Sequence, residues 1–151
     1  MNTFLHTVGK NNEIEIKIEV IKMTINEIRE LIPGATIMRN DVIYMSLDAD
    51  DDYRYDVTIA FTLKESGIMR IHGFCSDLKI SGDKVSDAIL FCNKYNKDYS
   101  FTQVYCDMSD HDFNASWAFD TSNMSDAAIR ENIKLVITAI WRFFVEVGKE
   151  F

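Results

Sequence analysis

The sequence predicts an α+β fold in which an antiparallel β-sheet packs against helices, in the order α-β-β-β-α-β-β-α. Three observations lead to this prediction. Large apolar residues alternate with polar or small ones over residues 53–63, which indicates a strand with one buried face. Apolar residues recur at three- and four-residue steps over residues 84–96 and 125–147, which is typical of helices that cover a sheet. Short polar segments separate the strand-like segments, so neighbouring strands can pair in antiparallel fashion.

The first helix is expected after Thr24. Thr24 and Glu27 have the Thr-x-x-Glu spacing of a capping box, in which the hydroxyl and the carboxylate each satisfy a backbone amide. The Pro-Gly pair at residues 33–34 ends this helix. Residues 42–47 form the first predicted strand, and the acidic turn 48–52 leads from it into the next one.

The strand over residues 53–63 is followed by the turn residues 64–67. Residues 69–72 then alternate between apolar and polar, so a further strand is expected to pair back against it in antiparallel fashion. Together with the strand over residues 42–47, these two strands form a predicted meander.

The second half of the chain is expected to begin with a helix over residues 84–96, in which Asn96 takes the left-handed conformation of a C-cap. Two short strands follow, over residues 101–106 and 115–119, and a polar turn joins them. The last helix covers residues 125–147 and spans roughly 30 Å at 1.5 Å per residue.

Residues 1–151 are predicted to form a single domain, because no repeat and no linker of Pro, Gly and Ser divides the chain. Residues 1–22 form an N-terminal extension with two interpretations. Isoleucines and valine alternate with charged residues over 13–20, which favours an edge strand, while Glu and Lys also suit a helix.

The last helix carries more apolar residues than a single stripe can hold. Four of them fall outside the main stripe: Leu135, Trp141, Phe143 and Val145. One interpretation is a helix that crosses the middle of the domain and is buried on several sides. The other is an interface, so that the protein is a symmetric homodimer through this helix or an exposed strand.

Composition excludes several classes of partner. Asp and Glu outnumber Lys and Arg by 24 to 16, and the formal net charge of −8 repels nucleic acid and anionic lipid. No run of about 18 apolar residues indicates a membrane span, and the first ten residues lack the pattern of a signal peptide. The three cysteines form no Cys-x-x-Cys pair, which fits a reducing cytoplasm.

No spacing in the sequence assembles a catalytic, cofactor-binding or metal-ligating site. The acidic turn that starts at Asp48 resembles a calcium loop, but Tyr53 stands where the loop needs Gly and Ile59 where it needs Glu. Cys92 with His72 or His111 suggests a thiolate–imidazole pair, yet Cys92 lies on the apolar stripe of its helix and is better interpreted as core. We therefore expect no catalytic residue, no cofactor and no metal.

One short motif carries a resemblance to a known family. The segment Cys92-Asn93-Lys94-Tyr95-Asn96, with Val104-Tyr105-Cys106-Asp107 after it, resembles the helix end and following strand of the YbjN-like family of bacterial proteins, which are often described as candidate sensory transduction regulators. The order of elements is similar to that of type III secretion chaperones. The resemblance covers residues 23–147, and its structural motif consists of Cys92, Asn93, Tyr95, Asn96 and Asp107. Tyr95 departs from the family, where Trp is frequent, and the turn after Asp107 has no Gly.

The resemblance implies a small, acidic protein of the bacterial cytoplasm, commonly dimeric, that contacts other proteins and has no catalytic residues. The leading hypothesis is a non-enzymatic protein-binding adaptor or chaperone-like regulator. The alternative is a small-molecule-binding sensor or enzyme. A deep pocket with converging polar groups favours the alternative, whereas exposed apolar surfaces and sheet edges favour the adaptor.

Overall fold

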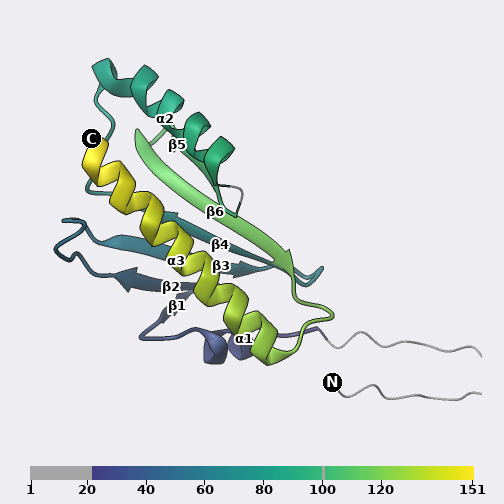
Figure 1. Ribbon diagram of the computed structural model, residues 1–151. Helices are drawn as coiled ribbons and strands as arrows, with labels where there is room; N and C mark the ends of the chain where they lie inside the picture. Colours follow the sequence, from purple (N-terminus) through teal and green to yellow (C-terminus); the bar gives the residue numbers. More distant parts are fainter. Residues whose placement is uncertain (1–21, 100) are drawn as a thin grey trace, which may run out of the picture.

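The computed structural model describes residues 22–99 and 101–151 (Figure 1). Six strands form one antiparallel sheet in the order β1-β2-β3-β4-β6-β5. The α+β fold predicted from the sequence is confirmed, with one strand more than expected. The elements are α1 (Ile25–Leu31), β1 (Ile37–Arg39), β2 (Val42–Leu47), β3 (Val57–Leu63), β4 (Ile68–Phe74), the 3-10 turn η1 (Gly82–Lys84), α2 (Val85–Asp98), β5 (Gln103–Asp107), β6 (Asp112–Asp120) and α3 (Asp126–Glu150).

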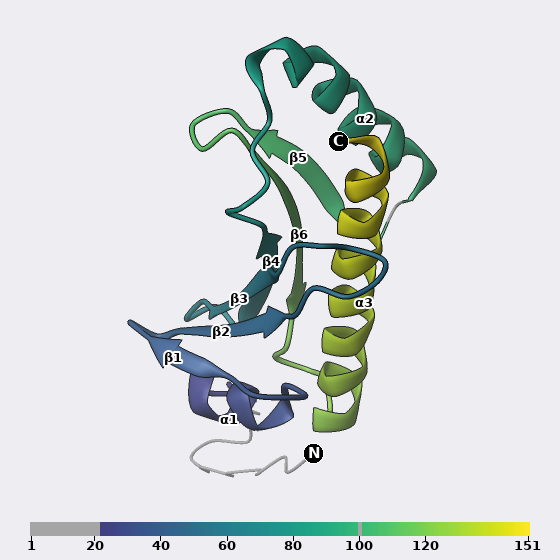
Figure 2. The same cartoon turned by 90° about the vertical axis from the view of Figure 1, so that its left-hand side faces the viewer.

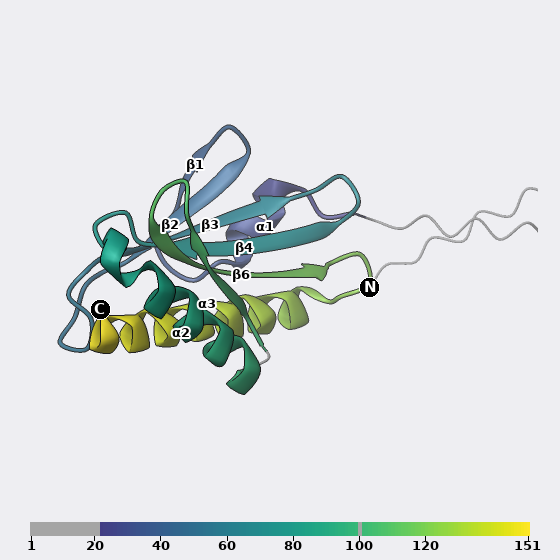
Figure 3. The same ribbon diagram turned by 90° about the horizontal axis from the view of Figure 1, so that it is seen from above.

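All three helices lie on the same face of the sheet (Figures 2 and 3). α3 crosses β3, β4 and β6, α2 lies against β5, and α1 lies beside β2 and the start of α3. The core fills the space between the sheet and these helices. Its largest fully buried side chains are Phe61, Phe113, Phe143, Phe144, Ile28, Ile43, Ile59, Met69, Ile71, Ile129, Ile133 and Ile140.

The capping box predicted at α1 is present. The backbone amide of Glu27 donates to Thr24 Oγ1 at 3.3 Å, and the backbone amide of Thr24 donates to Glu27 Oε2 at 2.7 Å. The second of these hydrogen bonds is the main cause of the lowered pKa of Glu27. The helix ends at Leu31, because the next residue, Ile32, precedes a proline and has an extended backbone.

The additional strand is β1, which forms a hairpin with β2. Asn40 and Asp41 connect the two strands with positive φ angles of 50° and 59°. Two such residues make a type I′ turn, whose twist matches that of the flanking strands. The sequence interpretation missed this hairpin because β1 has only three residues and the turn contains no glycine.

The predicted start of β3 at Tyr53 is wrong. β3 begins at Val57, and the backbone before it forms a loop in which Asp50 Oδ1 accepts hydrogen bonds from the amides of Asp52 and Tyr53. Although Tyr53 lies in this loop and not in a strand, its side chain is buried, at 2% exposure. Its apolar position therefore continues the strand-like alternation of the sequence. Its ring lies edge-on to Trp141 of α3 at 5.9 Å, so it fills space beside α3 instead of lying in the sheet.

The surplus apolar residues of α3 divide between the core and the surface. Phe143 is fully buried and packs against Tyr95, Phe144 and other rings, so it is not available to a partner. Trp141 and Val145 are half-buried, whereas Leu135 is 56% exposed. The interpretation of a helix buried on several sides therefore applies to Phe143, and only Leu135 is widely open to solvent.

One sequence expectation concerns the N-terminal extension, residues 1–22. The expected strand or helix over residues 13–20 lies outside the described residues. Within the described part, no helix combines the length and the apolar character needed to cross a membrane.

Candidate functional site

The face of the sheet opposite the helices has no helix over it in the described part of the chain (Figure 2). We call it the open face. Because side chains alternate across a sheet, the strand registers decide which residues share it. They are Ile37, Arg39, Val42, Tyr44, Ser46, Thr58, Ala60, Thr62, Ile68, Arg70, His72, Phe74, Gln103, Tyr105, Asp107, Asp112, Asn114, Ser116, Ala118 and Asp120.

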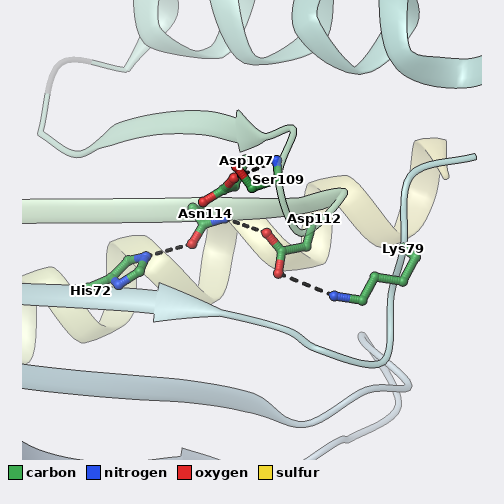
Figure 4. A network of polar contacts seen from close by, with 6 residues as sticks. All are labelled: His72, Lys79, Asp107, Ser109, Asp112 and Asn114. Carbon is green, nitrogen blue, oxygen red and sulfur yellow. Dashed lines mark hydrogen bonds and ion pairs between the residues drawn. The ribbon is translucent and has the colours of Figure 1, made fainter. Parts of the chain in front are cut away.

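A chain of polar side chains crosses the open face from β4 to the connection before α2 (Figure 4). His72 Nε2 lies 2.6 Å from Asn114 Oδ1, and Asn114 Nδ2 donates to Asp112 Oδ1 at 2.7 Å. Lys79 Nζ lies 3.5 Å from Asp112 Oδ2. Because a carboxylate and an amide oxygen only accept, the direction of donation runs from His72 through Asn114 to Asp112, and Nδ1 of a neutral His72 is left as an acceptor.

The register explains why these polar groups are buried on a face without a helix. Asn114 is paired with Phe74 of β4 on one side and with Tyr105 of β5 on the other. Flanked by two aromatic side chains, Asn114 is only 4% exposed, and Asp112 is 5% exposed. The His72 ring lies parallel to that of Tyr105 at a centroid distance of 6.4 Å. This burial lowers the pKa of His72.

The lowered pKa of His72 predicts a pH dependence of stability. As the pH falls, the unfolded chain protonates this histidine first, near its ordinary pKa of about 6.5. The stabilising contribution of neutral His72 is therefore complete above that pH and is lost as the pH falls toward the lower folded-state pKa, by at most about 1.4 kcal/mol per pH unit. Denaturant unfolding between about pH 7.5 and pH 5.5 measures this loss.

The matched variants are His72→Gln, which removes the titrating ring, and His111→Asn, which removes an exposed histidine from the β5–β6 turn. Asparagine suits the positive φ of 57° at position 111. We expect His72→Gln to flatten the pH dependence in this range and His111→Asn to leave it unchanged. If the free energy of unfolding falls equally with pH in wild type and His72→Gln, His72 is not the cause of the pH dependence.

The two edges of the sheet differ. On the β5 edge, Asn96 of α2 pairs with a backbone position of β5, since Val104 N–H donates to Asn96 Oδ1 and Asn96 Nδ2 donates to the Val104 carbonyl, both at 2.8 Å. The amide thus occupies the groups that another strand would use. The predicted role of Asn96 as a left-handed C-cap is wrong, because α2 continues to Asp98 and ends at Tyr99 in an extended conformation.

The rest of the family motif has a structural place. Cys92 and Tyr95 are buried, Cys92 against Cys106 of β5 and Tyr95 against Phe143 of α3, and Asn93 is exposed. Asp107 Oδ1 accepts a hydrogen bond from the backbone amide of Ser109 at 2.9 Å and so stabilises the turn after β5. Cys106 belongs to the same stretch and faces α2.

Within the described residues, no side chain pairs with the β1 edge in this way. In a hairpin with a type I′ turn, the two residues that flank the turn, Arg39 and Val42, exchange backbone hydrogen bonds with each other. The alternation of an antiparallel ladder then directs the backbone N–H and C=O of Met38 away from β2. These groups face outward beside Ile37, which is 61% exposed.

A cavity of about 460 Å³ lies away from the open face, between the loop before β3 and the end of α3. Three of its polar side chains already have partners within the protein. Asp50 accepts the loop amides, Arg54 lies 4.9 Å from the centre of the Tyr55 ring, and Lys149 pairs with Glu146. The cavity is lined by Asp50, Asp51, Asp52, Tyr53, Arg54, Tyr55, Leu78, Gly148, Lys149, Glu150 and Phe151.

The sequence pattern does not predict the hydrogen-bonded side chains that cross the open face. From the sequence alone, Asp112 and Asn114 have no assigned role, and His72 is only a candidate partner for Cys92. Alternation within each strand placed His72 outward correctly, but only the pairing of β4 with β6 brings Asn114 beside it. In the described ranges, no group of three or more His, Cys, Asp or Glu side chains is arranged to hold a metal ion.

Comparisons with known proteins give the fold an independent reference. No family model and no curated protein matches the chain. Among solved structures, the chain is similar to YbjN from E. coli, described as a candidate transcription regulator, with 7% sequence identity and a TM-score of 0.69 over 87% of this chain and 96% of that one. It is also similar to a chain in the HopA1–SchA chaperone–effector complex, with 9% identity and a TM-score of 0.49 over 79% of this chain and 88% of that one. The YbjN-like fold implied by the motif is therefore confirmed.

Proposed function

We propose that the protein is a non-enzymatic adaptor of the bacterial cytoplasm that binds an extended segment of another polypeptide. The observation that carries this proposal is the combination of an open sheet face with an edge strand, β1, whose outward backbone groups at Met38 have no neighbouring strand among residues 22–99 and 101–151. An incoming strand gains affinity from main-chain hydrogen bonds and specificity from the side chains beside it.

The surroundings of β1 suit such a strand. Ile37, Tyr44 and Val42 lie next to the edge on the open face and offer apolar contacts. Arg39 adds a positive charge at the hairpin end, while the acidic loop 48–52 and the net charge of −8 favour partners with basic residues. Because exposed charges are screened by salt, binding of a basic partner should weaken as the ionic strength rises.

The alternative of a small-molecule sensor or enzyme depends on the cavity beside α3, whose volume is within the ordinary range for ligand sites. Three of its polar side chains, those of Asp50, Arg54 and Lys149, already have partners within the protein. The adaptor therefore has the stronger support.

The substitution Met38→Pro tests the role of the edge. Proline removes the outward N–H at position 38 without removing a hydrogen bond between β1 and β2. We expect it to weaken capture of partner polypeptides on the order of tenfold, as one lost main-chain hydrogen bond would. Affinity purification from a bacterial lysate, read by quantitative mass spectrometry at low and high salt, measures the effect.

The matched control is Met38→Ala, which shortens the same side chain but keeps the N–H, and which should retain the partners. Equal loss in both variants would show that the side chain matters and the edge does not. If neither salt condition enriches any polypeptide while a metabolite screen shifts the melting temperature, the small-molecule alternative replaces the adaptor.

The same proposal includes a homodimer that uses the outer surface of α3. Leu135 is the apolar residue that α3 exposes most widely, and a two-fold axis near it would bring two copies together. We expect light scattering after gel filtration to give the mass of a dimer, and Leu135→Glu to give that of a monomer. A monomeric wild type at tens of micromolar would rule this out.

A further inference from the structure

Two cysteine thiols from different elements meet at the contact between α2 and β5. Cys92 Sγ of α2 lies 3.7 Å from Cys106 Sγ of β5. Both are free thiols, and the third cysteine in the chain, Cys75, is buried elsewhere, beside Tyr53. Cys92 is 4% exposed and Cys106 is half-buried.

The register between α2 and β5 explains why these thiols meet. Asn96 holds Val104 through two hydrogen bonds and so fixes one point of contact between the two elements. Cys92 is four residues before Asn96, about 6 Å along a helix, and Cys106 is two residues after Val104, about 6.6 Å along a strand. Because α2 and β5 lie side by side and run in opposite directions (Figures 1 and 2), these nearly equal steps bring Cys92 opposite Cys106.

We propose that Cys92 and Cys106 form an oxidative modification site, at which a two-electron oxidant of the peroxide class converts the two thiols into an intrachain disulfide. Hydrogen peroxide first oxidises Cys106, the more exposed thiol, to a sulfenic acid, and one water leaves. The sulfur of Cys92 then attacks the Cys106 sulfur, its proton and the hydroxyl leave as a second water, and the S–S bond forms. Peroxide accepts the two electrons that the thiols lose.

The geometry requires only a small movement. A disulfide bond is about 2.05 Å long, so the two sulfurs must approach by about 1.7 Å from their separation of 3.7 Å. Burial raises the pKa of both thiols, which keeps them protonated at neutral pH and makes the reaction slow there. The rate should therefore increase as the pH rises. The product links α2 to β5 at a second point beside the Asn96 contact.

The experiment uses the full chain at about pH 8, where more thiol is ionised. The protein is treated with hydrogen peroxide, alkylated and mapped by peptide mass spectrometry. We expect a Cys92–Cys106 cross-link with the loss of two hydrogen atoms. The melting temperature should rise by roughly 5–10 °C, since the link closes a loop of about 15 residues, and a reductant should reverse the shift.

Three variants separate this site from general oxidation. Cys75→Ser should form the same cross-link at the same rate, and Cys106→Ser should form none. Asn96→Ala, checked for its fold by circular dichroism, should form the cross-link severalfold more slowly because the register is released. The proposal is overturned if Cys106 is oxidised to the sulfinic acid without a cross-link, if Cys75 is cross-linked, or if the link joins two chains. An unchanged rate in Asn96→Ala would overturn the role of the register.

Discussion

Replacing Phe143 with alanine is expected to lower the free energy of unfolding by about 3–5 kcal/mol. The Phe143 ring lies at the centre of an aromatic cluster, with centroids of Tyr95 at 5.1 Å, Phe144 at 5.2 Å, and Phe91 and Phe113 at 6.2 Å. These rings come from α2, β6 and α3, so the cavity left by alanine loosens the contact between three elements. A loss of this size is a large part of the 5–15 kcal/mol that stabilises a typical protein.

Denaturant unfolding of Phe143→Ala measures this effect, with Leu90→Ala as the matched control. Leu90 is an exposed apolar residue of α2, at 66% exposure, so its loss should change the free energy of unfolding by no more than about 0.5 kcal/mol. Similar values for the two variants would show that Phe143 is not part of a packed core. The result would also return Phe143 to the set of candidate interface residues.

Gly73→Ala is expected to cost about 1–3 kcal/mol, although alanine is the smallest possible addition. Gly73 lies in β4 directly below α3, and a Cβ atom there would overlap Cγ2 of Ile140 and come within 3.3 Å of Ile59 Cδ1. α3 must therefore move away from the sheet or Ile140 must change its rotamer. The melting temperature and the free energy of unfolding both report the loss.

A second substitution at the same contact tests this explanation. Ile140→Leu removes the β-branch methyl that meets position 73 and keeps the side-chain volume. Since the two residues touch, we expect the double variant Gly73→Ala/Ile140→Leu to be more stable than the sum of the two single changes predicts. Strict additivity would mean that the cost at Gly73 arises from the backbone of β4 and not from its contact with α3.

Local patterns in the sequence predicted the elements and their buried faces. The capping box at Thr24, the alternation that buries Ile59 and Phe61, and the helical stripes of α2 and α3 depend on neighbours within a few residues. Such patterns are visible in one chain because the periods of helix and strand follow from backbone geometry alone. The motif around Asn96 also indicated the YbjN-like fold, although the reason for its asparagine was different from the one expected.

The positions at which local pattern and structure disagree have a common cause. Tyr53 continues a strand-like alternation, yet the hydrogen bonds of Asp50 turn the backbone before β3 and direct the ring to α3. Asn96 lies near a helix end, but its side-chain amide forms hydrogen bonds with the backbone N–H and C=O of Val104 and does not cap the helix. In both cases specific hydrogen bonds, between Asp50 and the loop amides or between Asn96 and the Val104 backbone, override the preference that local periodicity indicates.

The sequence by itself therefore determined the fold class, the faces of most elements and the lack of any recognisable catalytic or metal-binding spacing. Only the tertiary structure decided which residues are neighbours: His72 with Asn114, Cys92 with Cys106, and Phe143 with the rings of α2 and β6. The physical reason is that periodicity is a property of one segment, whereas register depends on how separate segments pair. A shift of one residue in that pairing would move every side chain of a strand to the opposite face.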